Sequence, residues 1–372
     1  MSERLKFKLE EDPKAELKNA VNSLIQKERL VLDFEERQNL DSEIEESDRF
    51  ITFVSEKRED GGNIKRFVKI PALRSAEVIN TFNRQVAVTK FLAEEGGLRT
   101  EKLLESKTDF KDGWPFMIVE AIDKEAKDPG FDHHGEHLGK EAAEGFAEAL
   151  ARLQAVDMRR FPMESRETLA HFSEKYEEMR NELMEILEQK VSPLDGKGEE
   201  VFHKVLGRRL SIKNFKKDIE VLLERLEPVI REEENGKEIL VHGNLDPGNA
   251  YVRKNGEVEL IDFEFTGVTR NEILGGMVDF GNLRARVWNN KNFRDAFDEA
   301  VIARYQKEGR EEVGRAIVSL GILRSHAILA GFFENYEHER QGEEDQIQRR
   351  DATEQDIKKA WEVAGVALSL VA

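Results

Sequence analysis

The sequence contains no cysteine, so disulfide bonds, thiolate metal sites and cysteine nucleophiles are all excluded. It also lacks a long uncharged apolar run. The most hydrophobic stretch, residues 316–333, is interrupted by Arg324 and His326, and we expect a buried helix there rather than a membrane span. The charged start, MSERLKFKLEEDPK, has no apolar core of the kind that secretory signals need. These absences predict a cytoplasmic protein with no membrane partner.

Positive charge is scarce relative to negative charge. The 58 Lys and Arg residues are outnumbered by 76 Asp and Glu residues, which gives a formal net charge of -18. Because nucleic-acid binding requires a basic patch or stripe, we predict no nucleic-acid partner, while cationic small molecules remain compatible. A length of 372 residues, with 39% hydrophobic and 36% charged residues, suits two packed lobes under a solvated exterior.

The N-terminal third alternates between helical and strand patterns. Apolar residues recur at helical spacing over 13–30 and 75–97, and β-rich runs at 49–57 and 64–70 flank the turn-forming REDGGN. Residues 114–122 are almost continuously apolar, which indicates one more buried strand. We therefore expect a small antiparallel sheet with one main helix, preceded by a helical extension.

Beyond residue 122 the composition is typical of long helices with short connections. The polar segment 123–137 marks the passage between lobes, and the one expected break among the helices is a hairpin around AYVRK and EVELID, joined by a Lys-Asn-Gly turn. The resulting prediction is an α+β protein with two lobes, residues 1–120 and residues 121–372, the second mostly helical.

A loop and hairpin in the second lobe carry the chemistry. The loop His242-Gly-Asn-Leu-Asp-Pro-Gly-Asn249 enters the first hairpin strand, and Asp262 follows thirteen positions later at the end of the next. A metal triphosphate needs hard oxygen ligands from two neighbouring segments, and a hairpin can bring Asn249 and Asp262 together at one end. We therefore predict that these two residues bind Mg²⁺.

These motifs resemble the aminoglycoside phosphotransferase and choline kinase-like family, relatives of the protein kinases. The catalytic loop of that family reads His-Gly-Asp-Leu-x-Pro-x-Asn before an Ile-Asp-Phe/Trp motif, and HGNLDPGN and LIDFE match it closely. The likeness runs from about Arg49 to about Ala285 and is strongest from Leu240 to Thr266. It implies a protein-kinase-like fold, a nucleotide-binding first lobe, and ATP- and Mg²⁺-dependent phosphoryl transfer to a hydroxyl of a small molecule.

The resemblance also implies roles for residues outside the loop. Lys69, in RFVKIP, matches the strand lysine that the family places against the nucleotide phosphates. Gln85 stands where the family has a helix glutamate that pairs with this lysine. Backbone groups near Glu120 and Ile122 would bracket adenine, and Asp279 resembles a structural aspartate downstream of the metal-binding one.

Three positions depart from the family pattern. Asn244 replaces the aspartate that accepts or orients the proton of the attacking hydroxyl, and an amide cannot take that proton. Asp246 is a candidate replacement, although an Asp before Pro is also common in turns. Gln85 offers no charge to Lys69. Where a phosphate-covering loop is expected, residues 36–50 contain no glycine and many carboxylates, which would repel phosphates.

Three functions therefore remain open. The first is a small-molecule kinase, with aminoglycosides, choline-like amines, amino sugars and homoserine-like compounds all compatible as acceptors. The second is a nucleotide-binding pseudokinase that acts on a protein partner, and the third is a scaffold without nucleotide. A further cluster of His, Asp and Glu at 132–137 contains metal-ligating residue types, but its spacing matches no known ligand pattern.

Overall fold

The computed structural model describes residues 13–32, 34–47, 49–59, 62–95, 98–110, 114–120, 126–127, 138–191, 212–336, 356, 359–360 and 362–365. Ile122 and the 132–137 cluster lie outside these residues. The chain divides into two compact units, the first formed by Met1–Glu94 with Thr100–Asp123 and the second by Glu95–Arg99 with Lys124–Ala372. Each unit is described by itself.

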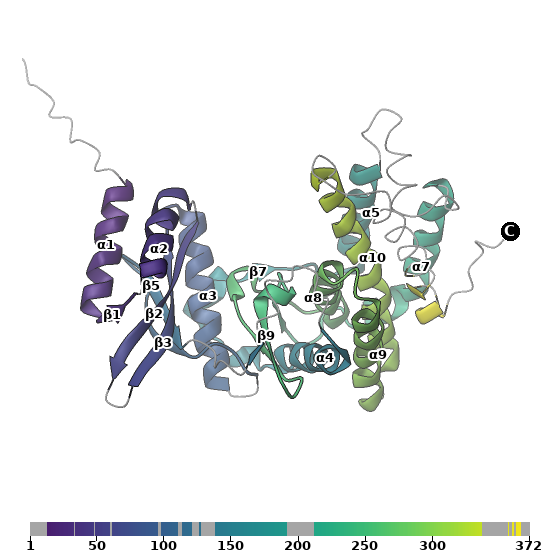
Figure 1. Ribbon diagram of the computed structural model, residues 1–372. Helices are drawn as coiled ribbons and strands as arrows, with labels where there is room; N and C mark the ends of the chain where they lie inside the picture. The colour runs from purple at the N-terminus through teal and green to yellow at the C-terminus, as the bar shows by residue number, and fades with distance from the viewer. Residues whose placement is uncertain are drawn as a thin grey trace, which may run out of the picture. The chain divides into compact units, whose positions relative to one another are not determined.

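The first unit contains an antiparallel five-stranded sheet in the order β1-β2-β3-β5-β4 (Figure 1). The predicted hairpin is confirmed, with register running from Phe50 opposite Pro71 to Glu59 opposite Gly62. β1 and β4 were not predicted, because β1 has two residues and β4, with the sequence LLESK, is too polar to look like a buried strand. The strands are β1 (Leu30–Val31), β2 (Phe50–Glu59), β3 (Gly62–Pro71), β4 (Leu103–Lys107) and β5 (Phe116–Glu120).

Helices cover both faces of this sheet (Figure 1). Since successive side chains of a strand point to opposite faces, β5 divides its apolar residues between two cores. Phe116 and Ile118 pack in the core formed with α1 and α2, and Met117 and Val119 pack with α3. The helices are α1 (Pro13–Lys27), α2 (Phe34–Glu46) and α3 (Ala76–Glu95). The sheet with α3 as its main helix agrees with the prediction, and α2 is an addition to it.

Helix α2 occupies the segment where a phosphate-covering loop was expected, so that expectation is wrong. Leu40 and Ile44, four residues apart, are buried in the core on the sheet. Two carboxylates of α2 bind strand β2: Glu43 Oε2 accepts a hydrogen bond from Thr52 N–H at 2.7 Å, and Glu36 Oε2 accepts one from Val54 N–H at 3.4 Å. β1 pairs with β2 only at Lys57 and Glu56, so the rest of that edge of β2 has no neighbouring strand. Glu43 supplies the hydrogen-bond acceptor that Thr52 N–H lacks there.

We expect Glu43→Gln to stabilise the first unit at neutral pH. Burial raises the pKa of Glu43, so the folded state holds this proton more tightly than the unfolded chain, and ionisation weakens folding as the pH rises through the folded pKa. Glutamine keeps an acceptor for Thr52 N–H without the charge. The urea midpoint should therefore rise at pH 7, and the gain should shrink toward pH ~4, below the unfolded pKa of about 4.3. Glu45→Gln, at an exposed position of the same helix, is the control; an equal gain there would contradict this explanation.

The second unit is mainly helical, as predicted. Helix α8 packs against α10, and α4 packs against α9. The stretch expected to be a buried helix lies in α10, where Ile317, Leu320 and Ile322 are buried. None of the described helices is long and apolar enough to cross a membrane. The helices are α4 (Lys140–Ala155), α5 (Tyr176–Val191), α7 (Ile212–Glu232), α8 (Glu272–Arg286), α9 (Lys291–Lys307) and α10 (Glu311–Tyr336).

Two small sheets interrupt the helices of this unit. The predicted hairpin is confirmed as β9 (Ala250–Arg253) and β10 (Val258–Leu260), with β6 (Ala126–Lys127) added to its edge. A second sheet was missed: β11 pairs antiparallel with β8 and parallel with β7. Its strands are β7 (Ala170–His171), β8 (Ile239–Val241) and β11 (Gly267–Thr269), which are too short to show a period of two.

The hairpin turn lies directly against helix α4. Gly256 in the turn has a φ of +81°, and a Cβ built on Gly145 of α4 would lie 1.9 Å from the Gly256 carbonyl oxygen. Only a residue without a side chain allows this approach of the two backbones. This contact holds the hairpin against α4. Any side chain at position 145 would force the two backbones apart.

We expect Gly145→Ala to destabilise the second unit by about 1–3 kcal/mol, the usual range for overpacking a close contact. The measurement is the free energy of unfolding from urea titration. The matched control is Gly139→Ala, just before the same helix, where the new Cβ would meet only the flexible end of Glu141 at 3.3 Å. Equal stability of Gly145→Ala and the wild type would show that the contact is not tight.

Candidate active site

The loop from His242 to Asn249 follows β8 and is held by helix α8. Asp279 accepts hydrogen bonds from two successive backbone amides, His242 N–H at 2.9 Å and Gly243 N–H at 2.8 Å. Asn282, one helical turn later, donates from Nδ2 to the Gly243 carbonyl at 2.9 Å. Burial raises the pKa of Asp279, while His242 and the two amides oppose that rise. The structural role predicted for Asp279 is confirmed.

The first two loop residues are constrained by their surroundings. His242 is fully buried, and its Nε2 lies 2.9 Å from the Ile261 carbonyl, which can only accept, so Nε2 carries the proton. This contact ties the loop to the strand segment that ends at Asp262. Gly243 has a φ of +82°, and a Cβ there would lie 2.3 Å from the Phe265 carbonyl oxygen, so glycine is required.

The hairpin brings the two predicted metal ligands to one end. Ala250 pairs with Leu260, and Ile261 N–H donates to the Asn249 carbonyl at 3.1 Å, so Asn249 and Asp262 follow at the same open end of the ladder. Asn249 Nδ2 donates to the Asn244 carbonyl at 2.7 Å. This bond fixes the amide, and among the described residues nothing donates to Asn249 Oδ1, which is left to act as a ligand.

Asp262 has an unusual backbone conformation. Its φ of 59° and ψ of 64° lie in the left-handed region, and it precedes the short 3-10 turn Phe263–Phe265. Among the described non-glycine residues only Arg29 and Asn235 share a positive φ. Such conformations persist where the surroundings impose them and cluster at functional sites. The conformation therefore supports a functional role for this carboxylate.

Asp246 caps the turn that contains Asn249. Its Oδ1 accepts the Asn249 N–H at 3.1 Å, and its Oδ2 lies 3.9 Å from Arg286 Nε. Of the two roles considered for Asp246, the structure shows the one in the turn, where Asp246 positions Asn249. The side chain of Asn244 is half-buried and forms no hydrogen bond within the described part of the chain, so it is available to a ligand.

In the first unit, Lys69 and Gln85 are both buried. Lys69 lies on β3 with Nζ 4.5 Å from the centre of the Phe50 ring. Gln85 lies on α3, and its buried Oε1 has no hydrogen-bond partner among the described residues, Lys69 included. The expected bond between the two side chains is therefore not formed. Glu120 ends β5, and its N–H donates to the Lys102 carbonyl at 2.9 Å, which removes that amide as an adenine contact.

The structure thus groups four predicted residues in the second unit, Asn244, Asp246, Asn249 and Asp262. Over the described ranges, no cluster of three or more His, Cys, Asp or Glu could hold a metal ion. One amide oxygen and one carboxylate suit Mg²⁺, which takes few protein ligands and completes its shell with phosphate oxygens and water.

Residues 52–316 match the profile of the Phosphotransferase enzyme family, which covers more than half of the chain. The chain belongs to this family. The match spans parts of both units described above, the one with the five-stranded sheet and the mainly helical one. A comparison with curated proteins finds no match.

Several solved structures are similar to this member of the family. An aminoglycoside phosphotransferase from Alicyclobacillus acidocaldarius is 12% identical, with a TM-score of 0.48, covering 84% of this chain and 88% of its own. An ethanolamine kinase from Plasmodium vivax is 12% identical, with a TM-score of 0.46 and coverages of 92% and 88%. A choline/ethanolamine kinase family protein from Mesorhizobium loti is 15% identical, with a TM-score of 0.41 and coverages of 83% and 85%.

Two residues that contact the loop were missed in the sequence. Asn282 lies three positions after Asp279, which places both on one face of α8, and this spacing could have identified it. Arg286, four positions further, ends the helix beside Asp246. Its contact depends on the path of the loop, which no local spacing predicts.

We expect Asp279→Asn to loosen the loop. An asparagine can accept only at Oδ1, so one of the two amide donors at His242 and Gly243 loses its partner, at about 1–3 kcal/mol for a buried group. The checks are the free energy of unfolding and the hydrogen exchange of the 242–245 amides. Glu299→Gln, on an exposed part of α9, removes a carboxylate elsewhere and should leave both unchanged. Unaltered exchange in Asp279→Asn would show that other contacts hold the loop.

Proposed function

We propose that this phosphotransferase family member transfers the terminal phosphoryl group of ATP, bound with Mg²⁺, to a hydroxyl group of a small molecule. The observation that carries the proposal is the grouping of Asn249 and Asp262 at one hairpin end. There the Asn249 amide is oriented by Asn244 and the whole loop is fixed by Asp279. Phosphoryl transfer depends mainly on positioning and charge stabilisation, and this site provides positioning.

The first unit would supply the contacts to the nucleotide. Lys69 would bind the phosphates, and Gln85 would hydrogen-bond to it once the nucleotide orders the site, which would satisfy the buried Oε1. Backbone groups near Glu120 and Ile122 would bracket adenine. When bound, Mg²⁺ neutralises charge that develops on the phosphate oxygens. Asn249 Oδ1 and the Asp262 carboxylate would hold that ion.

Asn244 would orient the acceptor hydroxyl without removing its proton. Its free, half-buried side chain can donate and accept hydrogen bonds at the loop. General-base assistance is typically worth about 10²- to 10⁴-fold, so turnover with an amide at this position would be slow. Asp246 would be a replacement base only if its carboxylate leaves the cap on Asn249.

A second candidate function is a nucleotide-binding pseudokinase that acts through a protein partner. The amide at position 244 and the buried, unbonded Gln85 Oε1 favour it, because both lie where catalysis would be supported by a carboxylate. The two functions share nucleotide binding and differ only in turnover, so two experiments separate them.

The first experiment tests binding by thermal shift with ATP and MgCl₂, each alone and together. ATP with Mg²⁺ should stabilise the protein, by about 2.7 kcal/mol at a ligand concentration of 100 Kd. Asp262→Ala and Asn249→Ala should each reduce the shift with ATP and Mg²⁺ toward that with ATP alone, whereas Glu299→Gln should respond as the wild type does. Absence of any shift in the wild type would remove both functions.

The second experiment tests turnover on a panel of hydroxyl-bearing amines, sugars and amino acids. Asn244→Asp should raise the rate by about 10²-fold or more if position 244 faces the acceptor. Asp246→Asn separates a cap from a base, since asparagine can still cap the turn but cannot take a proton. Retained turnover in Asp246→Asn supports the cap, and loss of turnover assigns the base to Asp246. Tight nucleotide binding with no product from the wild type or Asn244→Asp would leave the pseudokinase.

A further inference from the structure

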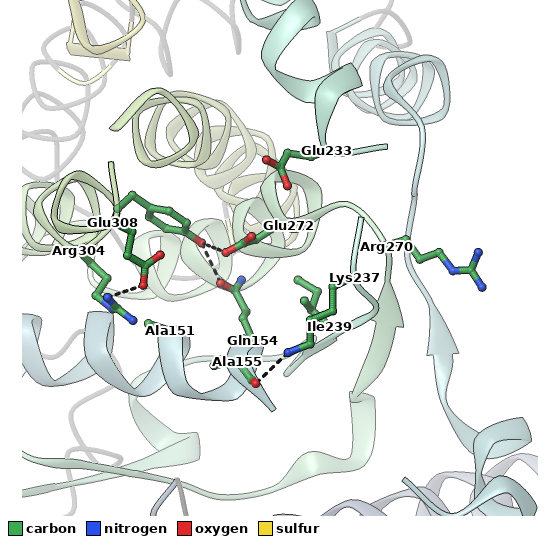
Figure 2. Close-up of a pocket in the computed structure, with 11 residues that line it drawn as sticks. Ala151, Gln154, Ala155, Glu233, Lys237, Ile239, Arg270, Glu272, Arg304 and Glu308 are labelled. Atoms are coloured by element: carbon green, nitrogen blue, oxygen red, sulfur yellow. Dashed lines mark hydrogen bonds and ion pairs between the residues drawn. The ribbon is translucent and has the colours of Figure 1, made fainter. Parts of the chain in front are cut away.

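A cavity lies in the helical unit, and none of its lining residues belongs to the loop 242–249. Its volume is about 170 Å³, and α4, α9, the segment after α7, β8 and the start of α8 form its walls. We call it the Tyr305 cavity. Its lining residues are Ala151, Gln154, Ala155, Glu233, Lys237, Ile239, Arg270, Glu272, Arg304, Tyr305 and Glu308 (Figure 2).

Hydrogen bonds among Tyr305, Gln154 and Glu272 form one wall of the Tyr305 cavity. Tyr305 Oη lies 3.0 Å from Gln154 Oε1 and 2.8 Å from Glu272 Oε1, and its single proton serves these two acceptors (Figure 2). Burial and then the charge of Glu272 raise the pKa of Tyr305 well above its ordinary value, so the phenol remains a donor. The contact occupies the oxygen of the Gln154 amide and leaves its nitrogen to other partners.

One end of the cavity has an excess of negative charge. Arg310 donates from Nη2 to Glu233 Oε1 at 2.8 Å and from Nη1 to Glu272 Oε2 at 2.9 Å, so two carboxylates share one guanidinium. Within the described ranges, Glu233 Oε2 accepts no hydrogen bond. A ligand group that donates hydrogen bonds and carries a positive charge would complete this end.

The other end offers donors without acceptors. Gln154 is only 7% exposed, and its amide nitrogen has no hydrogen-bond partner among the residues that the structure describes. Lys237 Nζ donates to the Ala155 carbonyl at 2.9 Å and keeps two further N–H groups. The charge of Arg304 is compensated by Glu308 at 2.6 Å, and Arg270 points away from the other labelled side chains (Figure 2). The available donors, Gln154 and Lys237, suit a carboxylate.

We propose that the Tyr305 cavity binds a small zwitterion of the α-amino acid class, with its ammonium group toward Glu233 and its carboxylate toward Gln154 and Lys237. The volume corresponds to about six water molecules at about 30 Å³ each, so the ligand is compact. Sites for drug-sized ligands are typically larger, about 300–1,000 Å³, so the size of this cavity favours a compact ligand over a nucleotide or a multi-ring sugar.

Occupancy of the cavity would be transmitted to the catalytic loop. Ile239 begins β8, which leads into His242, and Glu272 begins α8, which carries Asp279. The proposed ligand would be held by Lys237, two residues before β8, and by Glu233, which shares Arg310 with Glu272 at the start of α8. Binding would therefore restrain both elements that hold the loop. Binding should therefore slow hydrogen exchange in the amides of 239–243 as well as in the cavity walls.

The test is isothermal titration of the full chain, without nucleotide, with glycine, L-alanine and L-serine as zwitterions. Acetate and ethylamine are the matched probes that carry only one of the two charges. We expect saturable binding of at least one zwitterion and at least tenfold weaker binding of both single-charge probes. Binding of acetate as tight as that of the zwitterions would overturn the proposal.

Variants locate the binding site. Lys237→Met, at an exposed position where folding is not at risk, and Glu233→Gln should each weaken zwitterion binding about tenfold, as expected for loss of a charge-assisted hydrogen bond. Lys307→Met, at an exposed position of α9 outside the cavity, is the control and should bind normally. Unchanged affinity in both cavity variants would overturn the proposal.

Two further titration results would refute the Tyr305 cavity as the binding site. Binding that is lost in Asn244→Ala but unchanged in Lys237→Met would place the amino acid at the acceptor site and refute the Tyr305 cavity as its site. No saturable binding of any zwitterion also refutes it. Because these titrations contain neither ATP nor Mg²⁺, their failure leaves the proposed phosphoryl transfer untouched.

Discussion

The candidate site depends on one buried carboxylate that accepts two consecutive backbone amides. Asp279 holds His242 N–H and Gly243 N–H from helix α8, which fixes where the loop leaves β8. A buried carboxylate is costly unless its hydrogen-bonding capacity is used, and here the two backbone amides use one carboxylate oxygen each. Without this contact, the short strand β8 alone would have to position every downstream group.

Beyond Asp279, three further hydrogen bonds fix the rest of the loop. His242 binds the Ile261 carbonyl, Asp246 caps the turn at Asn249, and Asn249 orients its own amide on Asn244. Among the described residues, these contacts leave the Asn249 amide oxygen and the Asn244 side chain without hydrogen bonds. Under the proposed function these groups would position ligands, in a reaction governed by positioning and charge.

The sequence predicts this site well where the signal is local. The hairpin follows from alternating apolar residues around a turn, and the hairpin implies that Asn249 and Asp262 meet. The three-stranded sheet was missed because strands of two or three residues show no period. Helix α2 was misjudged because a loop was expected from the resemblance, although Leu40 and Ile44 have helical spacing. The unbonded Gln85 Oε1 depends on tertiary packing, which no pattern reveals.

The net charge of -18 does not predict the charge of any one site, because a bound ligand interacts mainly with the few charged groups next to it. In the Tyr305 cavity, two carboxylates share one guanidinium at one end. At the other end, the Gln154 amide nitrogen and two of the three N–H groups of Lys237 have no acceptor among the described residues. The start of β8 and the start of α8 form part of this cavity. The same two elements hold the loop further along, where β8 leads into His242 and Asp279 of α8 accepts two of its amides. A fold that places a polar cavity at the base of both supports makes loop order sensitive to what the cavity contains. Under the proposed function, that sensitivity would be a means of setting activity without altering any residue proposed to touch the phosphates.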